Sequence, residues 1–157
     1  MKFAAFLMLA SSLGRVPVCW AQDITIRLLD VRNARPLANE TVNVQFHVAR
    51  EDDIRMLKAK TGPDGTTTLR LPEPMPQAIF VLAGYPDLYP CSALSTIDTH
   101  QVISEGLVSR CCKPVQQCRC KFGKQILQLH ARPGELILLA RPMTWFERFT
   151  NKFDLWG

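Results

Sequence analysis

The chain has 157 residues, 47% of them hydrophobic, and its 19 Lys or Arg and 14 Asp or Glu give a formal net charge of +5. This length suits one domain with a hydrophobic core of its own. The charge is modest and acids are interspersed along the chain, which argues against nucleic acid as a partner.

The first 21 residues have the pattern of an export signal. Lys2 gives a positive start, residues 3–13 form an apolar stretch, and Pro17 breaks the run before Ala21. The apolar stretch is roughly half of the ~20 residues that a bilayer-spanning helix needs. We therefore expect residues 1–21 to be removed near Ala21 and the mature protein to be periplasmic or secreted.

The body of the chain predicts short strands separated by turns. Residues 41–48 alternate strictly, so that Val42, Val44 and Phe46 face one way. Turns are expected at residues 30–36, 62–65 and 133–134. The expected strands are residues 24–28, 41–48, 55–61, 66–71, 78–82, 125–131 and 136–141. Without βαβ alternation, these predict a mainly β fold over residues 22–142, a seven-stranded antiparallel sandwich.

Two short helices are expected beside the strands. Asp98 and Gln101 form a capping pair, and Gly106 can take the left-handed stop position. Thr144 and Glu147 repeat the capping pattern ahead of a C-terminal helix within residues 143–157.

The turn-rich stretches at residues 29–42 and 61–72 resemble the carboxypeptidase-regulatory-like domains. These domains belong to the Ig-like, prealbumin-like (transthyretin-like) β-sandwich group of exported bacterial proteins, and the likeness covers residues 24–84. It implies a sandwich with an accessory or interaction role. The tyrosine-arginine-glycine-serine tail of hydrolytic transthyretin-like enzymes is absent, because the sequence ends in Asp154-Leu155-Trp156-Gly157.

Residues 85–124 depart from that family pattern and are expected to form a cysteine-rich insertion. It holds Cys91, Cys111, Cys112, Cys118 and Cys120. In an oxidising compartment these predict disulfides, with Cys91 bonded to Cys111 or Cys112 and the neighbour to Cys118 or Cys120. The fifth thiol is then free or links two chains as a disulfide-bonded dimer.

The alternative for these cysteines is a metal site. Cys111, Cys112, Cys118 and Cys120 could supply four thiolates for zinc or Cu(I). Their spacing is unlike that of common zinc sites, because one pair is adjacent and the other is separated by one residue. We therefore expect no cofactor, with metal handling as the competing hypothesis.

A remote alternative is a non-haem iron enzyme like the intradiol dioxygenases, which use two tyrosines and two histidines. Tyr85, Tyr89, His100 and His130 match in number, but the closely spaced His-x-His pair of that family is absent. The chain also lacks a nucleophile elbow, a phosphate loop and a metalloprotease helix. We expect no enzymatic activity.

The C-terminal segment carries aromatic residues near helical spacing, with Arg148 and Lys152 between them. The aromatic residues are Trp145, Phe146, Phe149, Phe153 and Trp156. Such a helix can pack on its own domain, enter a groove of a partner, or lie on a membrane surface. Together these features predict an exported, non-catalytic binding or envelope-interaction module, with another envelope or extracellular protein as its partner.

Overall fold

The computed structural model describes residues 22–47, 54–92, 96–110 and 120–153, without the side chains of His47 and residues 150–153. The expected export signal lies outside these ranges. No helix within them is long and apolar enough to cross a bilayer.

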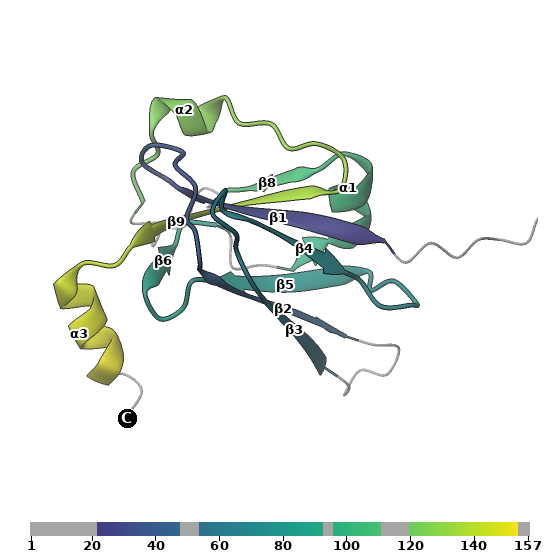
Figure 1. The fold of residues 1–157 in the computed structure, drawn as a ribbon, viewed down its shortest axis with the longest axis horizontal. Coiled ribbons are helices and arrows are strands. Elements are labelled where there is room, and N and C mark those ends of the chain that lie inside the picture. Colours follow the sequence, from purple (N-terminus) through teal and green to yellow (C-terminus); the bar gives the residue numbers. More distant parts are fainter. Residues whose placement is uncertain (1–21, 48–53, 93–95, 111–119, 154–157) are drawn as a thin grey trace, which may run out of the picture.

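The described residues form nine strands in two sheets (Figure 1). One sheet has the order β4-β1-β9-β6, with β8 also paired to β9, and the other has the order β3-β2-β5-β7. The strands are β1 (Asp23–Asp30), β2 (Thr41–His47), β3 (Ile54–Lys60), β4 (Thr66–Arg70), β5 (Ala78–Ala83), β6 (Leu88–Pro90), β7 (Ile97–Asp98), β8 (Leu107–Ser109) and β9 (Glu135–Pro142). The helices are α1 (Thr99–Ser104), α2 (Lys124–Leu127) and α3 (Trp145–Phe153).

The prediction of a mainly β fold is confirmed, but the expectation of seven strands, all antiparallel, is wrong. β9 runs parallel to β1, with Thr25 opposite Glu135 and Asp30 opposite Ala140. β8 is also parallel to β9. Alternating polarity reveals a strand but not its direction, so the sequence could not show that the last strand lies beside the first.

The main core lies between the two sheets. The predicted alternation in β2 is confirmed, and its apolar face meets that of β1. Inward-facing residues of these strands are at most 3% exposed: Ile24, Ile26, Leu28, Val42, Val44 and Phe46. Val48, expected to continue this face, lies outside the described residues.

A second core covers the outer face of β9, whose residues are therefore buried on both sides. Ile137 and Leu139 contact this layer, in which Ile126 is fully buried and Leu129 partly buried. The prediction of a strand at residues 125–131 is wrong, because the segment forms α2 and a following loop. Leu129 follows α2, and its N–H donates to the Ile126 carbonyl at 3.3 Å, so the turn brings both side chains to the second core.

Three short strands within residues 85–124, the expected cysteine-rich insertion, join the two sheets. β6 pairs with β9, β7 pairs with β5, and β8 pairs with β9, so this part of the chain contributes to both sheets. α1 begins where Asp98 accepts hydrogen bonds from the backbone of His100 and Gln101, as predicted, and Val102 is fully buried in the main core. Gly106 follows with a φ of +77°.

The two predicted turns near the start of the chain are also confirmed. The Ala34 N–H donates to the Asp30 carbonyl at 2.8 Å, and the Asp30 carboxylate accepts from the Arg32 backbone at 2.8 Å and guanidinium at 2.7 Å. In the second turn, Gly65 has a φ of +72°, and a Cβ there would lie 2.8 Å from the Leu28 carbonyl oxygen. Only glycine fits that position without strain.

Candidate functional site

The link from β9 to α3 is built by a reciprocal helix cap. The Thr144 N–H donates to Glu147 Oε2 at 2.9 Å, and the Glu147 N–H donates to Thr144 Oγ1 at 3.3 Å. This confirms the capping pattern predicted from the sequence. Just before the cap, Met143 is 8% exposed and its N–H donates to the Asp87 carbonyl at 3.0 Å.

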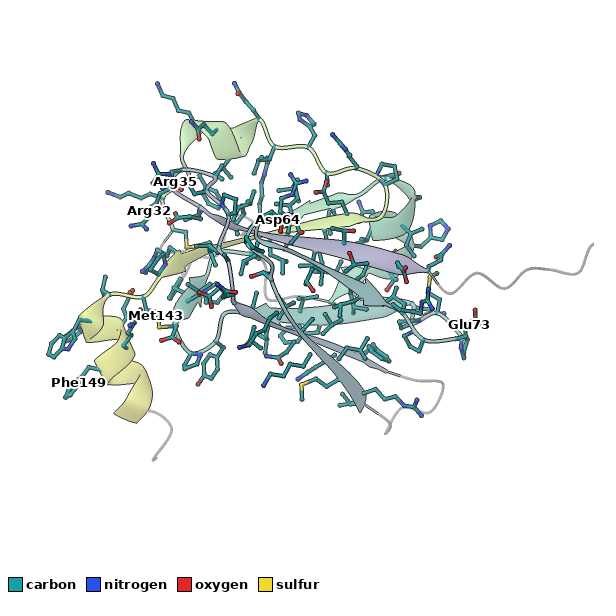
Figure 2. All side chains as sticks on the ribbon, viewed as in Figure 1. Arg32, Arg35, Asp64, Glu73, Met143 and Phe149 are labelled. Atoms are coloured by element: carbon teal, nitrogen blue, oxygen red, sulfur yellow. A yellow bond between two sulfur atoms is a disulfide. The ribbon has the colours of Figure 1, made fainter. Side chains whose placement is uncertain are left out.

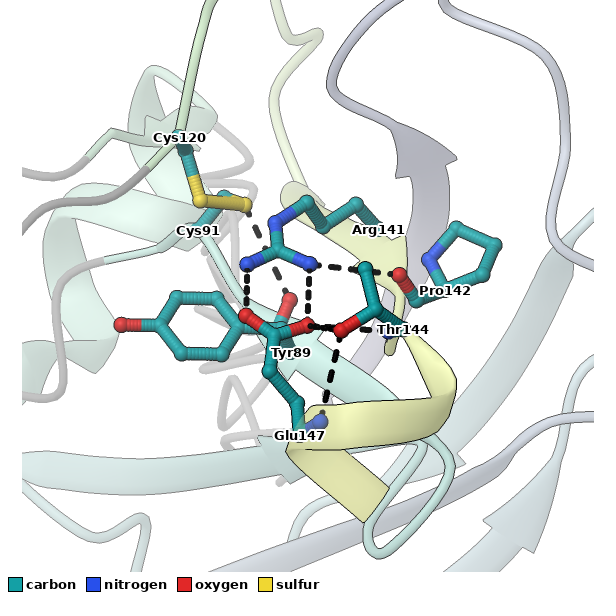
Figure 3. A network of polar contacts seen from close by, with 7 residues as sticks. All are labelled: Tyr89, Cys91, Cys120, Arg141, Pro142, Thr144 and Glu147. Atoms are coloured by element: carbon teal, nitrogen blue, oxygen red, sulfur yellow. Dashed lines mark hydrogen bonds and ion pairs between the residues drawn. A yellow bond between two sulfur atoms is a disulfide. The ribbon is translucent and has the colours of Figure 1, made fainter. Parts of the chain in front are cut away.

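Arg141 connects this cap to the sheet (Figure 3). Its guanidinium donates to both carboxylate oxygens of Glu147, at 2.8 and 2.5 Å, and lies 4.5 Å from the ring centroid of Tyr89. Tyr89 in β6 is the cross-strand partner of Arg141 in β9. The guanidinium is thus held by a bidentate ion pair with Glu147 and by a cation–π contact with Tyr89.

The charges of this pair stabilise each other. The hydrogen bonds from Arg141, followed by that from the Thr144 backbone, lower the pKa of Glu147 from 4.5 to about 2. In turn, Glu147 raises the pKa of Arg141 above its usual value. Both side chains are largely shielded, at 14% and 23% exposed. The pair is therefore held as an ion pair across the ordinary pH range.

The position of Glu147 on α3 determines which side of the helix faces outward. At about 100° per residue, Trp145, Phe149 and Phe146 fall within an arc of about 100°, and Glu147 lies about 150° from its centre. Because Glu147 is bound to Arg141, the aromatic arc faces away from the sheet. Figure 2 shows Phe149 pointing away from the body of the protein.

The aromatic side chains of α3 are exposed, and the helix projects from one end of the molecule (Figure 1). Trp145 is 77% exposed, Phe146 67% and Phe149 50%. Trp145 and Phe149 stack with ring centroids 5.6 Å apart. We call these three residues the aromatic face of α3. Phe153 belongs to α3, and Trp156 lies outside the described residues.

The disulfide joins Cys91 to Cys120, so the expected bond from Cys91 to Cys111 or Cys112 is wrong in this structure. Cys91 is fully buried at the end of β6, and Cys120 begins the segment that covers β9. The bond therefore ties the covering layer to the sheet. Cys111, Cys112 and Cys118 lie outside the described residues.

The metal and iron alternatives gain no geometric support from the part of the chain that the structure describes. Within it, no three His, Cys, Asp or Glu side chains come together as metal ligands. Cys120 is bonded to Cys91, which removes one of the four proposed thiolates. Tyr89 lies against Arg141, whereas the other three residues proposed for iron are exposed on separate segments: Tyr85, His100 and His130.

A second candidate site is an open cavity of about 520 Å³ between β3 and β4, the edge strands of the two sheets. Among the described residues that line it, none is a serine, cysteine or histidine. The lining residues are Phe46, Arg55, Met56, Leu57, Arg70, Leu71, Pro72 and Glu73.

The sequence did not reveal the role of Arg141 and Tyr89. β6 has three residues, too few to show alternation, so the cross-strand pairing with Arg141 gave no readable pattern. No protein-family model, curated protein or solved structure matches the chain.

Proposed function

We propose that this protein is a non-catalytic interaction module of the cell envelope that uses the aromatic face of α3 to attach to another envelope component. We place its body in the prealbumin-like sandwich group, on the resemblance carried by residues 24–84. The disulfide is consistent with an oxidising compartment outside the cytoplasm.

The observation that carries this proposal is the exposure of Trp145, Phe146 and Phe149 on a helix that is capped and fixed to the sheet. Large aromatic side chains are enriched at binding surfaces, because they bury much apolar area with few rotatable bonds. An isolated helix of nine residues is marginal in water. The Thr144 cap and the Arg141 pair therefore preorganise the contact surface, which lowers the entropic cost of binding.

The experiment is site-specific photo-crosslinking in cells that export the protein. A photoreactive amino acid replaces Phe146, and the control replaces Leu127, which is 63% exposed on α2. We expect discrete adducts to an envelope component from position 146 and none from position 127. Equal labelling at both positions, or none at either, would count against α3 as the attachment surface.

A further inference from the structure

We infer that the envelope component contacted by α3 is an anionic lipid surface, on which the helix lies with its aromatic face inserted at the headgroup level. This inference rests on the proposed function and names its partner. Aromatic side chains, tryptophan above all, are favoured at the boundary between lipid headgroups and acyl chains. Trp145, Phe146 and Phe149 present such a surface on one side of a short helix.

The charges of α3 favour a negatively charged surface. The helix contains one acid, Glu147, and two cations, Arg148 and Lys152. Glu147 is paired with Arg141 and turned towards the sheet, so its charge is neutralised locally. The other charged residues in the sequence of α3 are therefore cations.

The cationic positions also lie where an interfacial helix needs them. At about 100° per residue, positions 148 and 152 fall within about 60° of Trp145, on the side away from Phe146. Cations beside an apolar face reach lipid phosphates while their aliphatic stems stay near the acyl chains. Arg148 is 51% exposed and lies 4.0 Å from Asp87, itself 66% exposed. An exposed ion pair with this separation contributes little free energy, so lipid phosphates can compete with Asp87 for Arg148.

A second copy of the chain fits this surface less well. Pairing two aromatic faces side by side would bring the cations of one α3 near those of the other. Like charges brought together across an interface oppose association. A lipid surface with negative headgroups instead complements both the aromatic face and its cationic border.

The test is flotation of the exported, disulfide-bonded protein with vesicles of phosphatidylcholine alone or with about a quarter phosphatidylglycerol. We expect binding to the anionic vesicles that weakens with added salt. The variant Trp145→Ala/Phe149→Ala should lose it. Arg148→Gln/Lys152→Gln should bind roughly fivefold more weakly for each cation removed.

The control variants remove the same kinds of side chain, cationic and apolar, from the surface near α2. Lys121→Gln/Lys124→Gln deletes two exposed cations near α2, and Leu127→Ala deletes an exposed apolar side chain there. Both controls should bind vesicles as the unaltered protein does. Circular dichroism checks that each variant stays folded.

Three outcomes would overturn the lipid assignment: no vesicle binding, equal binding to both vesicle types, or self-association that the aromatic variant abolishes in sedimentation. Photo-crosslinking at position 146 shows whether only the lipid assignment fails or the attachment role of α3 fails as well. Adducts to a protein without vesicle binding would refute the lipid partner and keep the attachment role. Absence of both would refute the two together.

Discussion

Arg141 and Glu147 join the last strand to the last helix through two hydrogen bonds of 2.8 and 2.5 Å. The same carboxylate also accepts from the Thr144 N–H, so it caps α3 and fixes the helix to the sheet. One side chain thus sets both where α3 begins and which way its aromatic face points. The presentation of the proposed contact surface depends on this carboxylate.

Replacing Glu147 with glutamine should loosen α3 without unfolding the body. Glutamine keeps the size but loses the charged, two-point pair with Arg141. We expect the free energy of local unfolding of α3 to fall by about 1–2 kcal/mol, which is the usual cost of losing a helix cap or a charged hydrogen bond. Amide hydrogen exchange of residues in α3 measures this. Glu105→Gln, at an exposed acid after α1, is the control and should leave exchange in α3 unchanged. Unchanged exchange in Glu147→Gln itself would contradict the role of the pair.

The attachment of α3 should be lost in acid. The pKa of Glu147 is lowered from 4.5 to about 2 when α3 is in place, so this group stabilises the attached state at pH values above about 4.5. As pH falls from about 4.5 through 2, protonation removes that stabilisation. NMR shifts of α3 amides followed through this window should show the change. Glu147→Gln should show no such step, and a step centred near the ordinary glutamate pKa would contradict the ion pair.

The disulfide should contribute measurably to stability. Cys91 and Cys120 are 29 residues apart, and closing a loop of this length restricts the unfolded chain by about 3–4 kcal/mol. Replacing both cysteines by alanine should lower the free energy of unfolding in urea by about that amount. Peptide mapping without reductant should recover Cys91 linked to Cys120. Recovery of Cys91 linked to Cys111 or Cys112 would contradict the bond described here.

Local chemistry explains which parts of the fold the sequence predicted. Turns at residues 30–36 and 62–65 and caps at Asp98 and Thr144 depend on nearby residues, and all four are found. The aromatic face of α3 was likewise visible from helical spacing.

Long-range relationships were not visible in the same way. The parallel pairing of β1 with β9, the three-residue β6 and the partner of Cys91 each depend on segments far apart in the chain. Residues 125–131 alternate apolar with polar residues, as a strand would, only from Leu127 onward. They form α2 and a loop because Ile126 and Leu129 pack on the outer face of β9. Tertiary packing overrides such a local pattern.

The covering role of α2 can be tested with two adjacent residues. Ile126 is fully buried against Ile137 and Leu139, whereas its neighbour Leu127 is 63% exposed. Ile126→Ala should lower the free energy of unfolding by about 2–4 kcal/mol, through lost burial and the cavity it leaves. Leu127→Ala should change it by no more than about 0.5 kcal/mol. Chemical denaturation of both variants therefore tests the second core, and equal losses at the two positions would contradict the described packing.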